Sequence, residues 1–170
     1  MNMDEAMEPV AATKYRGLAA RMNFLAIDRG DLQYASKEGC KHMSSPKNGD
    51  WEVIKRAGRY LRGRPRSAQL FPFESACKKL TGYADSDWAG DKVTLKSTSG
   101  GALFLGQSMI KSWSTNQTIV ALSSGEAELY SLTKLASQTV GMISLAGDFQ
   151  VSLTGEIKSD SSAAIGIASR

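Results

Sequence analysis

The sequence has one histidine, two cysteines and no long hydrophobic run, and each scarcity argues against a class of protein. His42 is the only histidine and has no acid or nucleophile set around it in sequence, so a Ser-His-Asp or Cys-His mechanism is not indicated. Cys40 and Cys77 lack CxxC or other zinc-ligand spacing, and we interpret them as reduced thiols. No apolar stretch could span a bilayer, and the N-terminus lacks the regions of a signal peptide. We therefore expect an intracellular protein with no membrane partner.

The composition favours a folded chain whose two halves differ in charge. With 170 residues and 42% hydrophobic content, the chain is long and apolar enough for one domain, or one small domain with an appended segment. Residues 1–80 hold 15 Lys and Arg against 9 Asp and Glu, whereas residues 81–170 hold 6 against 8. This asymmetry predicts different roles for the two halves.

The first half has the apolar spacing of short helices. Residues 1–13 are acidic, rich in methionine and aperiodic, and we expect a disordered tail there. Apolar residues at helical spacing then predict helices over about 15–26, 32–40 and 50–61, the last capped by Asp50. These helices would form a helical segment over 14–66, and a linker over 67–79 follows the breakers Gly63 and Pro65.

The third predicted helix and its exit carry six cations opposed by one acid, Glu52. Such a run could follow a nucleic-acid phosphate backbone whatever its base sequence. It could equally be a solvated helix face, and the pattern alone leaves both interpretations open. We call these residues the basic segment: Lys55, Arg56, Arg59, Arg62, Arg64 and Arg66.

The second half changes from helical to strand-like periodicity. Strands are predicted over 80–88, 100–105 and 109–114, with short connections typical of antiparallel neighbours. A long helix should begin at the capping box of Ser123 and Glu126 and end near Gly147. Its predicted apolar face comprises Leu129, Leu132, Leu135, Ala136, Val140 and Ile143. A further strand over 155–160 and the start of another helix complete a mixed α/β order, and we expect the chain to stop within that last element.

Three acids fall where strands end and a helix begins: Asp85, Glu128 and Asp160. Sites in open α/β sheets gather at strand ends, so these carboxylates could converge. Converging carboxylates repel one another unless cations offset the charge, and oxygen ligands without histidine or thiolate favour Mg²⁺ or Mn²⁺. The alternative is that they are ordinary strand-end and helix-start acids. Under this alternative Glu126 is a helix cap. Asp87 and Asp91 are interpreted as loop residues or as groups that support the site.

Several ordered motifs resemble one family. GYADSDWAGD, STSGGALFLG, IKSWSTNQTIVALSSGEAEL and IKSDSSAAI are similar, in this order and spacing, to the ribonuclease H domain of copia-type LTR retrotransposon polyproteins. The segment from YRGLAAR to YLRG resembles the region that joins the reverse transcriptase to that domain. The resemblance implies a ribonuclease H-like mixed sheet of five strands with flanking helices, here over residues 80–170, incomplete at its C-terminal end and preceded by the helical segment.

The resemblance also implies an activity, which is hydrolysis of the RNA strand of an RNA/DNA hybrid. Asp85, Glu128 and Asp160 match the family's catalytic, metal-binding acids, which hold two Mg²⁺ or Mn²⁺ ions. The expected partners are the hybrid and the reverse transcriptase part of the same polyprotein, without a small-molecule cofactor. The expected location is cytoplasmic, in a virus-like particle. Trp88 and Trp113 are expected in the core rather than on substrate sugars.

One departure from the family leaves activity open. The family's fourth acid, which helps to hold the ion that activates water, has no match in this sequence. Losing a ligand from a two-metal site lowers both ion affinity and geometric control. The alternative function is therefore a truncated, inactive retrotransposon remnant that at most binds nucleic acid.

Overall fold

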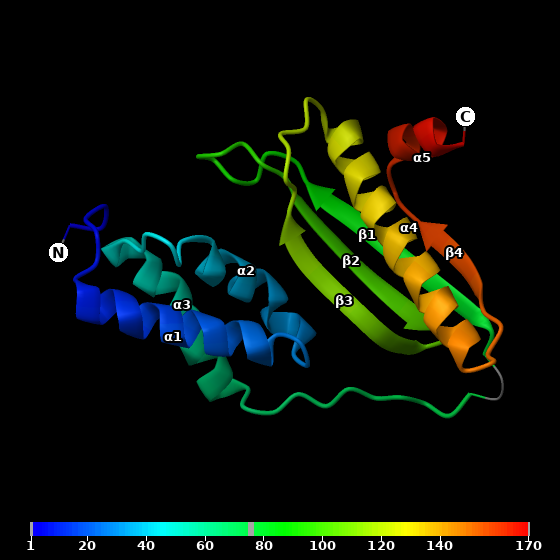
Figure 1. Cartoon of the computed structure of the whole chain (residues 1–170), viewed down its shortest axis with the longest axis horizontal. Coiled ribbons are helices and arrows are strands. Elements are labelled where there is room, and N and C mark those ends of the chain that lie inside the picture. The colour runs from blue at the N-terminus through cyan, green and yellow to red at the C-terminus, as the bar shows by residue number, and fades with distance from the viewer. Residues whose placement is uncertain (1, 75–76, 170) are drawn as a thin grey trace. The chain divides into compact units, whose positions relative to one another are not determined.

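The computed structural model describes residues 2–74 and 77–169, which divide into two compact units at Gln69/Leu70. The first unit is helical (Figure 1). Its elements are α1 (Pro9–Leu25), η1 (Gly30–Leu32), α2 (Gln33–Lys41), η2 (Asn48–Asp50) and α3 (Trp51–Gly63). No helix in the described residues is both long and apolar enough to cross a membrane.

Tyr15 on α1 anchors the core of the helical unit. Its side chain is fully buried, and its hydroxyl donates to the carbonyl of Gly39 on α2 at 2.6 Å. The ring meets the Trp51 ring of α3 edge to face at a centroid distance of 5.8 Å. One aromatic side chain therefore contacts all three helices, satisfying its own polar group while burying its ring.

The prediction of a disordered tail over residues 1–13 is wrong for the residues that the structure describes. Ala6 forms an isolated antiparallel bridge with Lys47, and the N–H of Met7 donates to the carbonyl of Pro46 at 3.0 Å. Met7 is buried and α1 already begins at Pro9. Main-chain hydrogen bonds to residues 46–49 and the burial of Met7 thus order a segment that has no periodicity of its own.

Asp50 does not cap α3 as predicted. Its carboxylate instead accepts a hydrogen bond from the N–H of Lys47 at 2.6 Å, and no side-chain cap bond is present at α3. The reason is the 3₁₀ turn η2, which directly precedes α3: Asp50 is its last residue, and the turn brings the Asp50 carboxylate back to the N–H of Lys47, the residue before the turn.

The second unit is a mixed sheet with helices, as predicted. It comprises β1 (Lys79–Asp87), β2 (Thr98–Leu105), β3 (Ser108–Asn116), α4 (Ser124–Asp148), β4 (Thr154–Lys158) and α5 (Ser162–Ala168). The strand order is β3-β2-β1-β4, with β1 antiparallel to β2, β2 antiparallel to β3, and β1 parallel to β4. This architecture is compatible with a ribonuclease H-like fold; the described residues form four of the five strands that the resemblance implies.

The long helix α4 packs across β1 and β2 (Figure 1). Leu80, Leu103 and Leu135 are fully buried between helix and sheet. Burying each leucine contributes about 1.5–3 kcal/mol. Gly82 permits this close approach, because a Cβ there would lie 2.6 Å from Cδ1 of Leu135.

The buried face of α4 differs from the predicted apolar stripe. Val140 is 66% exposed, whereas Ser131 and Thr139 are buried. Small side chains are needed where the backbone of the sheet comes close: a Cβ at Gly155 would lie 2.9 Å from Cγ2 of Thr139. Packing distance, and not hydrophobicity, therefore decides which residues face the sheet here.

The predicted capping box at the start of α4 is present in modified form. The hydroxyl of Ser123 accepts a hydrogen bond from the N–H of Glu126 at 3.2 Å. The Glu126 carboxylate accepts from the N–H of Leu122 at 2.7 Å, one residue before the expected partner. Glu126 is therefore occupied as a cap, as the sequence indicated.

Candidate metal centre

Three carboxylates from three different elements meet in the second unit. One carboxylate oxygen from each of Asp85, Glu128 and Asp160 lies within 4.8 Å of the other two. Asp85 is near the C-terminal end of β1, Glu128 is in the second turn of α4, and Asp160 directly follows β4. Because β1 and β4 are parallel neighbours, their C-terminal ends lie at the same edge of the sheet. Sheet topology thus brings together acids that are 75 residues apart in sequence.

Glu128 is oriented by the residue that follows Asp85. Its Oε1 atom accepts hydrogen bonds from the N–H of Ser86 at 3.1 Å and from the Ser86 hydroxyl at 2.8 Å. Its Oε2 atom is buried and has no hydrogen-bond partner among the described residues. A buried anionic oxygen without a partner is costly, and a cation at this point would offset that cost. The donor set therefore fits a metal ion with oxygen ligands.

Ser131 fixes α4 against the strand that carries Asp85. Its buried hydroxyl donates to the main-chain carbonyl of Asp85 at 2.8 Å and lies 3.3 Å from that of Gly100. Since Ser131 is three residues after Glu128 on the same helix, this contact sets the height of the Glu128 side chain over β1. Sequence reasoning missed both Ser86 and Ser131, although the position of Ser86 directly after Asp85 was a signal.

An open cavity of about 320 Å³ adjoins the carboxylates. Its lining includes Asp85, Asp160 and Lys158, with Tyr83 beside them. The Lys158 ammonium lies 5.7 Å from the centre of the Tyr83 ring. The cavity thus combines two exposed acids, which could hold a metal ion, with the Lys158 ammonium, which could pair with an anionic group of a ligand.

The neighbouring acids have other surroundings. Asp87 is exposed at the end of β1 and is not part of the carboxylate cluster. Asp91 accepts hydrogen bonds from the N–H groups of Val93 and Thr94 at 3.0 and 3.4 Å, so it shapes the loop after β1. This agrees with the prediction of a loop role for Asp91.

The two tryptophans of the second unit divide between core and surface. Trp113 is partly buried and packs against the central cluster, in line with the core prediction. The core prediction is wrong for Trp88, which is 48% exposed. Its Nε1–H donates to the carbonyl of Ala121 at 3.0 Å, so the ring joins two loops instead of filling the interior.

The basic segment lies on α3 and its exit, in the helical unit. All six of its side chains are exposed. Lys55 pairs with Glu52 at 2.9 Å. Within the described residues, the other five cations of the segment form no ion pair with an acid. Its role in nucleic-acid binding stays a prediction.

Comparison with known proteins shows which proteins the chain is similar to. No family profile matches it, and no solved structure does. It is 34% identical over 142 residues to the retrovirus-related Pol polyproteins from transposons RE2 and RE1 of Arabidopsis thaliana, which covers 84% of this chain and 10% of each polyprotein. It is also 34% identical over 126 residues to the secreted RxLR effector protein 161 of Plasmopara viticola, covering 72% of this chain and 86% of that protein. Over most of its length, the chain is therefore related to retrovirus-related Pol polyproteins of plant transposons.

The chain spans about a tenth of the length of the RE1 and RE2 polyproteins. The predicted relationship to retrotransposon Pol polyproteins is thereby confirmed. The relatives' names do not mention ribonuclease H. The comparisons therefore show a relationship to retrotransposon Pol polyproteins, and the chemistry must be argued from the carboxylates.

Proposed function

We propose that this Pol segment is a metal-dependent endonuclease that hydrolyses the RNA strand of RNA/DNA hybrids during retrotransposon reverse transcription. The convergence of Asp85, Glu128 and Asp160 within 4.8 Å carries the proposal. Three carboxylates at one point favour a site that operates with bound cations, the more so because one of them has a buried oxygen with no hydrogen-bond partner in the described part of the chain.

The donor chemistry favours hard divalent ions. The cluster offers carboxylate oxygens only, without histidine or thiolate, and this set suits Mg²⁺ or Mn²⁺. When bound, such ions lower the pKa of water and stabilise the leaving oxygen of a phosphodiester. Asp85, Glu128 and Asp160 are the residues that would hold them.

The chain's own residues have separate tasks in this proposal. Ser86 keeps the Glu128 carboxylate turned in one direction, because both of its hydrogen bonds go to a single oxygen. Lys158, beside Asp160 in the cavity, would attract a phosphate of the substrate strand. The basic segment would bind the duplex backbone, and ribose 2′-hydroxyls would distinguish RNA from DNA.

The test is cleavage of an end-labelled RNA/DNA hybrid by the full chain with Mg²⁺, beside a DNA duplex of the same sequence. We expect cleavage of the RNA strand alone. Asp85→Asn should lower the rate about 100-fold or more, since it removes a charged ligand from the cluster. Asp87→Asn is the matched control: it lies on the same strand outside the cluster and should keep the rate within about threefold.

Two outcomes would contradict the enzyme proposal. A chain that binds the hybrid but never cuts it would support the alternative of an inactive nucleic-acid-binding remnant. Equal cleavage by the natural chain and Asp85→Asn would show that the activity does not come from this cluster.

A further inference from the structure

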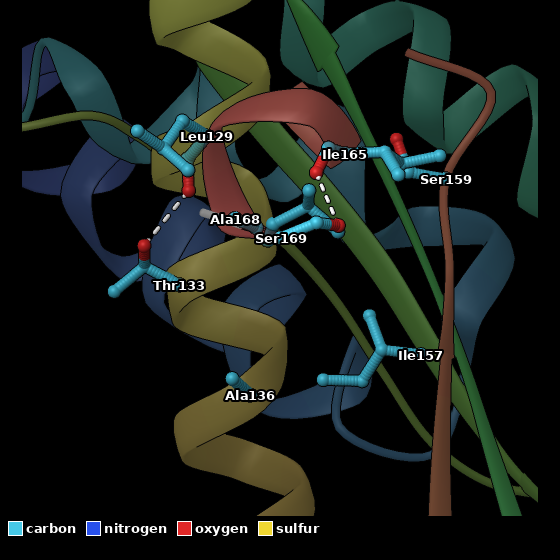
Figure 2. A pocket seen from close by; sticks show the side chains of 9 residues that line it. Leu129, Thr133, Ala136, Ile157, Ser159, Ile165, Ala168 and Ser169 are labelled. Carbon is cyan, nitrogen blue, oxygen red and sulfur yellow. Dashed lines mark hydrogen bonds between the residues drawn. The ribbon is translucent and has the colours of Figure 1, made fainter. Parts of the chain in front are cut away.

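The two flanks of the long helix α4 differ in chemistry. On the flank towards β4, Leu129, Thr133 and Ala136 line an apolar groove (Figure 2). On the flank towards β3, Tyr130 and Lys134 line a separate cavity of about 200 Å³, together with the end of β3 and the loop that follows it. This second cavity has a charged group in its lining and shares no residue with the carboxylate cluster.

Two lysines on this flank are hydrogen-bonded to neutral side chains. The Nζ of Lys134 donates to the hydroxyl of Thr115 on β3 at 2.6 Å. Lys111, on the same strand, donates to the side-chain carbonyl of Gln138, one turn further along α4. Neither bond neutralises a charge. Burial of Lys134 and the nearby charge of Lys111 both lower the pKa of Lys134, so an anion bound beside the two ammonium groups would relieve their repulsion.

Gln117 connects the elements that surround the cavity. It lines the cavity and is itself buried. Its Nε2 donates to the hydroxyl of Ser99 on β2 at 3.0 Å and to the carbonyl of Ala127 on α4 at 2.8 Å. These bonds tie the loop after β3 to both the sheet and the helix. The cavity is therefore largely formed before a ligand arrives, which lowers the entropy cost of binding.

The cavity lies in the same cross-strand row as the carboxylate cluster. Ser86, which orients Glu128, pairs in register with Ser99, and Ser99 pairs with Thr115. Since neighbouring strands are about 4.8 Å apart, Thr115 lies roughly 10 Å from Ser86. The grooves of a B-form duplex are about 6 and 12 Å wide, so one duplex can reach the cluster and the cavity at once.

We propose that Lys134, with Lys111 beside it, binds backbone phosphates of the nucleic-acid duplex whose scissile bond lies at the carboxylate cluster. The inference rests on the proposed function for the identity of the duplex. The helix partners of the two lysines are one turn of α4 apart, so the lysines follow the helix axis and suit successive phosphates of one strand. Thr115 is a positioning residue, because its hydroxyl holds the Lys134 ammonium at the cavity.

The first test is acylation of the lysines of the full chain, read by mass spectrometry with and without a saturating RNA/DNA hybrid. The buffer contains EDTA, so that no strand is cut. Lys111 and Lys134 should react about fivefold or more slowly in the complex, because a phosphate covers each ammonium. Lys78, an exposed lysine before β1, is the control and should change less than about twofold. Unchanged reactivity of Lys111 and Lys134 in the complex overturns the proposal, and so does a hybrid that does not bind.

The second test is the salt dependence of hybrid affinity, measured in EDTA by fluorescence anisotropy. Lys134→Gln and Lys111→Gln should each weaken binding about fivefold and reduce the slope of log affinity against log salt by about 0.9. Lys134→Arg keeps the charge and should keep the slope, as should Lys78→Gln. Circular dichroism checks that each variant is folded. A slope that Lys134→Gln and Lys111→Gln leave unchanged overturns the proposal.

Cleavage with Mg²⁺ separates this inference from the proposed function. A chain that cuts the hybrid while Lys111 and Lys134 stay reactive to acylation in the complex contradicts the phosphate site and leaves the enzyme proposal standing. A chain that shields both lysines and loses salt dependence in both glutamine variants, but never cuts the hybrid, supports phosphate binding at this flank and contradicts the enzyme proposal.

Discussion

Ser86 donates two hydrogen bonds to one oxygen of Glu128, from its N–H at 3.1 Å and from its hydroxyl at 2.8 Å. Ser86 directly follows Asp85, so a single strand end supplies one carboxylate of the cluster and orients the second. The direction of the Glu128 carboxylate therefore depends on the position of β1, and we expect the Ser86 hydroxyl to raise the metal affinity of the cluster.

Ser86→Ala removes the hydroxyl and keeps the main-chain bond. We expect hybrid cleavage to fall about tenfold and the Mg²⁺ concentration for half-maximal rate to rise, because the Glu128 carboxylate gains freedom to rotate. Rates measured over a Mg²⁺ series check this. Ser137→Ala, an exposed serine on α4, is the control and should leave the series unchanged. An unaltered Mg²⁺ dependence of Ser86→Ala would contradict a positioning role.

Glu128 and Glu126 lie on adjacent parts of the same helix but have different partners. Glu128→Gln removes the charge at the cluster and should lower the cleavage rate about 100-fold or more. Glu126→Gln weakens the hydrogen bonds from the Leu122 N–H and the Tyr130 hydroxyl, so it should cost roughly 0.5–1 kcal/mol of stability and leave cleavage nearly intact. Cleavage assays and chemical denaturation of both variants check this pair, and a reversed pattern would move the site to Glu126.

The basic segment predicts a salt-dependent affinity for nucleic acid. The double variant Arg56→Ala/Arg59→Ala should weaken hybrid binding and reduce the slope of log affinity against log salt by about 2, because each phosphate contact contributes about 0.9. Fluorescence anisotropy across a salt series measures the slope. Lys14→Ala/Arg21→Ala removes two exposed cations of α1 and should leave it nearly unchanged. Equal losses in both double variants would indicate a general charge effect without a defined surface.

The helical unit should lose stability in acid through Asp31. The Arg29 guanidinium donates to this carboxylate at 2.7 Å and the Tyr60 hydroxyl also donates to it, which lowers the pKa of Asp31 to about 2. A carboxyl whose folded pKa lies below its unfolded value stabilises the fold above about pH 4. That contribution is lost as the pH falls from about 4 through 2.

Amide exchange of α1 and α2 between pH 5 and pH 2 measures this loss. Asp31→Asn should remove this part of the pH dependence, because the carboxyl that titrates is gone. Asp28→Asn, at an exposed position on the same connection, should keep it. A dependence that survives Asp31→Asn would assign the acid sensitivity to another carboxyl.

Local patterns were sufficient for much of this chain. Helical spacing predicted α2 and α3, and alternation and short turns predicted the hairpin strands. Position at a strand end singled out Asp85 and Asp160, and position in the early turns of the long helix singled out Glu128. These signals succeed because periodicity and capping act over a few neighbouring residues, which the sequence displays directly. The catalytic role of the three acids remains a prediction.

Only the tertiary structure decided what depends on contacts between distant residues. It ordered the N-terminal segment through Met7, exposed Val140 while burying Thr139, and put Trp88 at the surface. It also joined Ser86 to Glu128, 42 residues away. The physical reason is that close packing and hydrogen-bond geometry depend on which backbones approach each other, and this distance is set by the assembled sheet and helix together.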